Sequence, residues 1–195
     1  MKRIIVAGTG TGVGKTVVSA ILAMALKADY WKPIECGKSD THKVQKWIET
    51  STHRPSYRFK APLSPHAAAQ LENIRIVQER IKIPHVERAL IIETVGGVFT
   101  PLAENLVSLD LFKQWDASWI VVSKHYLGSI NQTLLTLEAL KKAGVDILGI
   151  VFNGKPNPAS ESAILKISNV PFFARVLPEF FIRAKTIKKY AEQFS

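Results

Sequence analysis

The chain has one cysteine, Cys36, among 195 residues, so a disulfide framework is excluded. Such sparing use of cysteine is typical of a reducing compartment. Long hydrophobic runs are also missing. The apolar stretch at residues 4–7 turns directly into glycines, and no later run approaches the roughly 18 residues of a membrane span. It is likewise too short for the apolar part of a signal peptide. We therefore expect a soluble, cytoplasmic protein.

Acidic residues are in the minority, with 16 Asp and Glu against 26 Lys and Arg, a formal net charge of +10. The basic residues are dispersed: no run of five like charges occurs, and no strip alternates aromatic with basic residues. This pattern favours a solvated basic surface over a polyanion-binding face, so we expect no nucleic-acid or membrane partner. Repeats, low-complexity tracts and linkers are absent too, which favours one domain over residues 1–195.

Short β-rich apolar runs alternate with helical periodicities along the chain. The predicted strands are residues 2–7, 29–34, 89–93, 119–123, 147–152 and 170–177. Helices are predicted from residue 17, near 44–48, over 130–141 and over 184–194, with 67–88 mostly helical and 51–65 a loop. This alternation predicts an α/β fold with a doubly wound, mostly parallel sheet and helices on both faces. Ligands then bind at the carboxyl ends of the strands.

A phosphate-binding loop, Gly-Thr-Gly-Thr-Gly-Val-Gly-Lys-Thr at residues 8–16, follows the first strand and precedes a helix. Its glycines let backbone N–H groups converge on phosphate oxygens. Lys15 would reach the β- and γ-phosphates of ATP, and the Thr16 hydroxyl would bind Mg²⁺. The spacing departs from the usual one, since Gly8 lies one residue early. The alternative, a glycine-rich turn with a chance Lys-Thr, is disfavoured by the flanking elements.

Polar residues follow the second predicted strand. Lys32 would hold a second anion and Asp40 would reach a metal ion, although a surface lysine and a helix-capping aspartate are the ordinary interpretation of each alone. Cys36 by itself is more typical of a small buried residue than of a nucleophile.

An acid, Glu93, closes the strand at residues 89–93, where nucleotide-binding enzymes place a carboxylate for Mg²⁺. Gly96 and Gly97 follow it and would let a ligand approach the backbone. A purely structural turn is the alternative here.

Taken together, these motifs resemble the dethiobiotin synthetase family. The resemblance spans residues 2–178 and rests on residues 8–16, Lys32-Pro33 with Gly37, Ser39-Asp40, Ser64-Pro65-His66, Glu93 with Gly96-Gly97, Thr100-Pro101-Leu102, Leu127-Gly128-Ser129-Ile130-Asn131 and Asn153. It implies a P-loop nucleotide-binding domain with a mostly parallel seven-stranded sheet, a homodimer, and the substrates 7,8-diaminononanoate, CO₂ and ATP. The family forms a carbamate on one amine, phosphorylates it with ATP, and closes the cyclic urea of dethiobiotin with the second amine.

The resemblance also implies roles for individual residues. The expected catalytic residues are Lys32, Lys15 and Thr11, and the expected Mg²⁺ ligands are Thr16, Asp40 and Glu93. ATP would be bound by Gly12, Val13, Gly14, Lys15, Thr16, Val17 and Asn153, the last contacting adenine, with residues 175–178 near the base. The substrate would be bound by Thr11, Lys32, Cys36, Gly96, Gly97, Gly128, Ser129, Ile130 and Asn131. The last four would receive the substrate carboxylate across the dimer interface.

Two departures from the family pattern stand out. Cys36 replaces a hydroxyl residue, and Thr94-Val95 replaces a Gly-Ala pair, which is expected to narrow the pocket or alter the backbone. A partitioning-type P-loop ATPase switch that binds DNA or membrane is the second interpretation, and a related amide-forming or phosphotransfer enzyme with another acceptor is the third. Lys32 and the compact stretch at residues 93–102, which suit a small substrate, favour the ligase.

Overall fold

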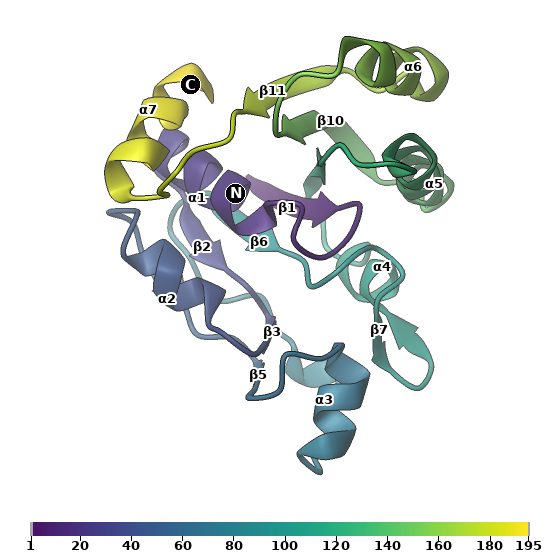
Figure 1. Cartoon of the computed structure of the whole chain (residues 1–195). Coiled ribbons are helices and arrows are strands. Elements are labelled where there is room, and N and C mark those ends of the chain that lie inside the picture. The colour runs from purple at the N-terminus through teal and green to yellow at the C-terminus, as the bar shows by residue number, and fades with distance from the viewer. Residues whose placement is uncertain (1, 195) are drawn as a thin grey trace.

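The computed structural model describes residues 2–194. Its largest element is a seven-stranded, fully parallel sheet in the order β11-β10-β9-β1-β6-β2-β4 (Figure 1). These strands are β1 (Arg3–Gly8), β2 (Asp29–Trp31), β4 (Thr52–His53), β6 (Leu90–Glu93), β9 (Ser118–Ser123), β10 (Asp146–Asn153) and β11 (Phe172–Val176). The helices are α1 (Lys15–Ala25), α2 (Asp40–Gln45), α3 (Pro65–Leu71), α4 (Ser108–Phe112), α5 (Ser129–Lys142), α6 (Pro158–Ser168) and α7 (Ala184–Phe194). The predicted doubly wound fold is confirmed.

Two apolar layers cover the sheet because successive strand residues point to opposite faces. On β1, Ile4 and Val6 join the core formed with α1 and α7. Ile5 and Ala7 join the opposite core, formed with α4 and α5. The central strands are buried on both faces, which explains why they are continuous apolar runs in the sequence.

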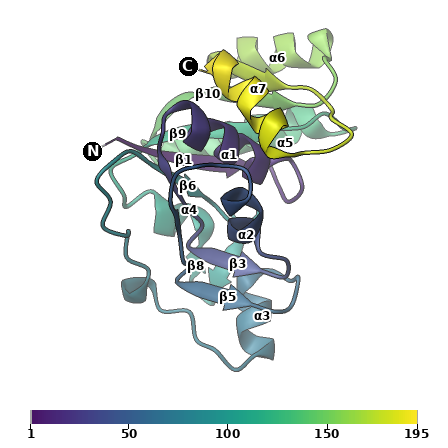
Figure 2. The same ribbon diagram turned by 90° about the vertical axis from the view of Figure 1, so that its left-hand side faces the viewer.

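Smaller elements lie beside the large sheet, below β6 in the view of Figure 2. A parallel pair, β3 (Ile34–Cys36) with β5 (Tyr57–Phe59), extends from there and carries α3 at its end. A separate hairpin joins β7 (Pro101–Ala103) to β8 (Leu106–Val107). Within residues 2–194, no helix combines the length and hydrophobicity required to cross a membrane.

Three regional predictions were wrong. The predicted loop at 51–65 contains β4 and β5, and the predicted strand at 29–34 is divided into β2 and β3 at Lys32-Pro33. The predicted helix at 67–88 ends at Leu71, and only a 3₁₀ turn, Gln78–Arg80, follows. Asn73 adopts a left-handed conformation that ends the helix. Beyond it, Ile76 and Ile81 are buried individually from irregular backbone, so their apolar spacing is not helical.

Candidate active site

The phosphate loop connects β1 to α1, as predicted. Gly14 begins the helix with φ of 105°, and its carbonyl accepts the backbone N–H groups of Val17 and Val18. A Cβ atom at Gly14 would lie 2.1 Å from Nδ2 of Asn153. Both the left-handed backbone and this close approach require glycine at position 14.

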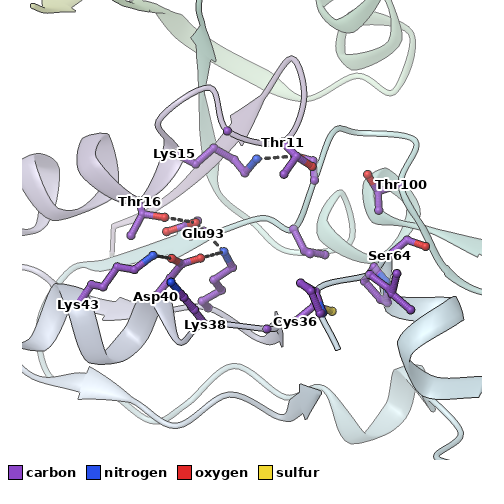
Figure 3. A pocket seen from close by; sticks show the side chains of 18 of the residues that line it. Thr11, Lys15, Thr16, Cys36, Lys38, Asp40, Lys43, Ser64, Glu93 and Thr100 are labelled. Atoms are coloured by element: carbon purple, nitrogen blue, oxygen red, sulfur yellow. Dashed lines mark hydrogen bonds and ion pairs between the residues drawn. The ribbon is translucent and has the colours of Figure 1, made fainter. Parts of the chain in front are cut away.

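Lys15 ties the phosphate loop to the turn after β6 (Figure 3). Its ammonium donates to the carbonyl oxygens of Gly10 at 2.8 Å and Gly96 at 2.6 Å. Burial lowers the pKa of Lys15 to about 8, an effect that Glu93 partly opposes and Lys32 reinforces. The loop therefore presents a buried cation where phosphate oxygens would lie.

Lys32 lies between the two predicted acidic metal ligands. Its Nζ is 2.5 Å from Oδ2 of Asp40 and 2.8 Å from Oε1 of Glu93. Burial lowers the pKa of Lys32, but Glu93 and Asp40 raise it more, so it lies above its usual range. Burial raises the pKa of Asp40, but the neighbouring Lys32 and Lys43 lower it more, so this pKa lies below its ordinary value. The cluster is thus a charged network at the carboxyl edge of the sheet.

The Glu93 carboxylate accepts hydrogen bonds from three side chains. Thr16 Oγ1 donates to Oε1 at 2.9 Å, the atom that also accepts from Lys32, and Tyr30 donates its hydroxyl proton to Oε2 at 2.7 Å. A hydroxyl and two carboxylates are hard oxygen donors of the kind that Mg²⁺ prefers. The described residues contain no group of three or more His, Cys, Asp and Glu side chains that could hold a metal. A small donor set completed by water and phosphate oxygens is the usual Mg²⁺ arrangement in phosphoryl-transfer sites.

Asp40 is positioned by a buried acid, Glu35 of β3. Glu35 Oε1 accepts from the backbone N–H and the hydroxyl of Thr41, both at 2.6 Å, and Oε2 accepts from Ser39 Oγ at 2.8 Å. Ser39 in turn caps α2 by accepting from His42 N at 3.1 Å. The residues on either side of Asp40 are therefore held by one carboxylate.

A cavity of about 1120 Å³ brings most of the predicted site together. Of the predicted residues, its lining includes Thr11, Gly12, Gly14, Lys15, Thr16, Val17, Lys32, Cys36, Asp40, Glu93 and Gly96. Lys38, Lys60, Ser64 and Thr100 add polar groups to the lining of the same cavity. Gly97 instead lines a neighbouring cavity of about 550 Å³, which Thr11 shares.

Val13 and Asn153 do not line the main cavity. Asn153 ends β10, and its side-chain amide donates to the Val13 carbonyl at 2.8 Å. The predicted adenine residue is thus in direct contact with the phosphate loop.

The predicted carboxylate-binding segment, residues 128–131, also lies apart from the main cavity. Gly128 begins α5 with φ of 96°, Ser129 is buried, and Leu127 before them is fully exposed. None of residues 128–131 lines the main cavity, although Gln132, the next residue of α5, lines the neighbouring cavity together with Thr11.

The two departures from the family pattern differ in effect. Thr94 is buried and donates its hydroxyl proton to the Val6 carbonyl at 3.2 Å, so its side chain is directed into the sheet, while Val95 lines the cavity. In this turn the positive φ occurs at Gly96 and not at Thr94. Cys36 lines the cavity, where burial raises the pKa of its thiol to about 11, so it remains a neutral thiol.

Three contributors to the network were missed from the sequence: Tyr30, Glu35 and Lys43. Lys43 lies three residues after Asp40 on α2 and pairs with its Oδ1 at 2.7 Å. That spacing signals a helical ion pair. Tyr30 and Lys32 are two residues apart, which places them on one face of an extended segment, but nothing local indicates that this face meets Glu93.

Comparison with known structures and families agrees with this geometry. Residues 2–179 match the family described as AAA domain. The fold is similar to the cell division ATPase MinD of Pyrococcus furiosus (TM-score 0.57, 17% identity, 99% of this chain and 98% of that one). It is also similar to MinD of Pyrococcus horikoshii OT3 complexed with Mg-ADP (TM-score 0.60, 17% identity, 98% and 95%). The fold and the phosphate loop define a P-loop nucleotide-binding protein of the α/β class.

Relatives of higher identity give the family within this class. ATP-dependent dethiobiotin synthetases from Christiangramia forsetii, Chlamydia pneumoniae and Cytophaga hutchinsonii are 46%, 44% and 42% identical to the chain. The matches cover 99%, 100% and 98% of the chain and 96%, 90% and 96% of the relatives. The chain belongs to the dethiobiotin synthetase family, and the predicted class of enzyme, an ATP-dependent ligase, is confirmed.

Proposed function

We propose that the chain catalyses the ATP- and Mg²⁺-dependent conversion of 7,8-diaminononanoate and CO₂ to dethiobiotin. The observation that carries this proposal is the single cavity that holds both the phosphate loop and Lys32. The phosphate loop suits a triphosphate, and Lys32 offers a cation to an anionic acceptor. A site that only hydrolysed ATP would have no need of this cation.

The reaction proposed for this cavity has three steps. One amine of the diamine adds to CO₂ and loses a proton, which gives a carbamate. A carbamate oxygen attacks the γ-phosphorus of ATP and expels ADP, which gives a carbamic–phosphoric anhydride. The second amine attacks the anhydride carbon, inorganic phosphate leaves with the electron pair, and a proton is lost as the cyclic urea forms.

The residues of the cavity would act mainly by charge and position. A carbamate and a triphosphate are both anionic, so their approach requires fixed cations. Lys15 would bind the transferred phosphoryl group and Lys32 the carbamate, and Thr11 would help to orient the acceptor. The buried network around Lys32 keeps these groups from reorganising during the reaction.

Thr16, Asp40 and Glu93 would hold Mg²⁺. When bound, the ion would neutralise phosphate charge and orient the γ-phosphoryl group. Thr16 and Glu93 are already within hydrogen-bond distance, and Asp40 and Glu93 already hold one cation, the Lys32 ammonium, between them. This donor set supports a Mg²⁺ assignment.

Adenine and the second subunit complete the proposal. The Asn153 amide offers both a donor and an acceptor to an adenine edge. Residues 128–131 open α5, whose N-terminus would favour a carboxylate from the substrate of a partner subunit in a homodimer. None of these residues lines the main cavity of its own chain, which supports that arrangement. We also propose that the enzyme acts in the cytoplasm as one nucleotide-binding domain, without nucleic-acid or membrane partners.

The partitioning-type switch is the weaker alternative. Its solved representatives match the fold at 12–17% identity, against 38–46% for the synthetases. Helix α7 is amphipathic, but its apolar residues Ile187, Tyr190 and Ala191 are buried, and the first two lie in the core that α1 shares. That face is thus not available as a membrane anchor, and the dispersed basic charge gives DNA no defined surface.

The test is phosphate release from Mg-ATP and bicarbonate, with and without 7,8-diaminononanoate, while the product mass is followed. Release that depends on the diamine, together with a cyclic urea product, supports the ligase. ATP turnover that is indifferent to the diamine contradicts it and favours the switch. A steep dependence of DNA binding on salt concentration would favour the switch further.

A further inference from the structure

We propose that Tyr30 is a positioning residue that fixes the Glu93 carboxylate for Mg²⁺ binding, an inference that rests on the proposed function. Tyr30 lies in β2 and is fully buried. Its hydroxyl donates to Glu93 Oε2 at 2.7 Å. Tyr30 does not line the cavity, and its hydroxyl contacts the site through Glu93.

The two oxygens of Glu93 have different partners. Oε1 accepts from Thr16 and Lys32 and therefore faces the charged network, whereas Oε2 accepts from Tyr30. The terminal torsion of a glutamate is broad and leaves the carboxylate plane poorly fixed by itself. The Tyr30 hydrogen bond removes this freedom and presents Oε1 to the site.

The sheet gives Tyr30 a rigid base for this role. Strands β2 and β6 are parallel neighbours, with Tyr30 opposite Ile91, so the tyrosine hydroxyl reaches the acid at the end of the adjacent strand. Its ring packs in the core that also contains Val18 and Val44. Lys32 follows two residues later, so one short segment supplies two of the three donors to Glu93.

Tyr30→Phe tests the role because it keeps the buried ring and removes only the hydroxyl. Among the described residues, Tyr30 is the one side chain recorded as donating to Oε2, so the variant leaves that atom without its donor. ATP affinity is measured by calorimetry with and without Mg²⁺. The ratio of the two affinities, the magnesium gain, is expected to fall about tenfold, while the affinity without Mg²⁺ stays within about twofold.

Tyr57→Phe is the matched control. The Tyr57 hydroxyl accepts from the backbone N–H of Val77 at 2.9 Å and has no contact with the acids of the site. This variant is expected to retain the wild-type magnesium gain. A wild-type gain in Tyr30→Phe overturns the proposal, even when its thermal stability falls, because a merely structural tyrosine would change stability alone.

A second measurement uses the unmutated chain labelled with 3-fluorotyrosine. The chain has four tyrosines, so the Tyr30 fluorine resonance is assigned by elimination with Phe variants of the other three. It is expected to shift when Mg²⁺ is added to the nucleotide complex, and the absence of a shift overturns the proposal. If the ATP affinity of the wild type does not depend on Mg²⁺, the metal assignment and the Tyr30 role are both contradicted. If the wild type shows a clear magnesium gain and Tyr30→Phe shows the same one, only the Tyr30 role is contradicted.

Discussion

The Lys32 ammonium lies 2.8 Å from Glu93 Oε1, and the two side chains are only 8% and 1% exposed. A buried ion pair of this kind is costly to form from solvated charges, so its stabilising value is modest. Its position at the edge of a nucleotide cavity gives it another use: a cation fixed in place before the transition state forms requires no later reorganisation.

Lys15→Ala and Lys32→Ala are each expected to lower diamine-dependent turnover at least about tenfold, the effect of losing roughly 1.4 kcal/mol of transition-state stabilisation. Each change removes a cation that would face the phosphate or the carbamate. Turnover is measured by phosphate release on protein shown to be folded by circular dichroism. Lys142→Ala, at a side chain that is 76% exposed, is the control and is expected to leave turnover unchanged. Near-normal turnover in either variant would remove that lysine from its proposed role.

Glu35→Ala is expected to lower the free energy of unfolding by about 3 kcal/mol, because donors of Thr41 and Ser39 lose a buried acceptor. Glu35→Gln keeps an acceptor for Thr41 and is expected to lose less than half as much. Urea denaturation measures both. Equal losses in the two variants would mean that the hydrogen bonds contribute little beyond packing.

Local patterns sufficed to predict the phosphate loop and the strands around it. Gly14 and Lys15 belong to one short strand–loop–helix segment, whose sequence carries all the information needed. The rule that parallel strands end at one edge also predicts that Lys32 and Glu93, which are 61 residues apart, lie at the same edge of the sheet, although it does not predict their contact. Helix α6 was missed although Asn157 and Pro158 form a recognisable N-terminus, with the Asn157 side chain accepting from Ser160 N.

The partners of the charged residues could not be predicted from local patterns. Tyr30 reaches Glu93 only because β2 lies directly beside β6, and strand order is not written in any local pattern. Glu35 acts on Asp40 through the turn that joins β3 to α2, whose path depends on tertiary packing. The predicted helix at 67–88 was wrong beyond Leu71 for a different reason. The apolar residues there are buried from an irregular backbone, so their spacing does not indicate a helix.

Acid should weaken the protein in part through Glu161 of α6. Burial raises the pKa of this carboxyl, but the Arg175 guanidinium, the Asn157 N–H and His125 together lower it from 4.5 to about 2. A pKa that is lower in the folded state adds stability above pH 4.5, and this stability is lost as the pH falls toward 2.

The measurement compares the unfolding free energy of wild type and Glu161→Gln between about pH 6 and about pH 3. At the higher pH, the variant is expected to have a lower free energy of unfolding than the wild type. This difference is expected to shrink as the pH is lowered. Glu138→Gln, at an acid that is 60% exposed, is expected to show no such trend. A difference that stays constant with pH would contradict the depressed pKa of Glu161.

Asn153 contacts the phosphate loop through the Val13 carbonyl, so a loss of ATP affinity in Asn153→Ala has two possible causes: a lost contact with adenine or a disturbed loop. Three ligands distinguish them. If Asn153 contacts the base, ATP affinity is expected to fall about tenfold, whereas GTP and inorganic triphosphate lose little. If the asparagine only supports the loop, all three lose affinity alike, because all three present phosphates to it. The first pattern, measured by calorimetry, would place adenine beside β10, where the parallel strands bring Asn153 and the phosphate loop together.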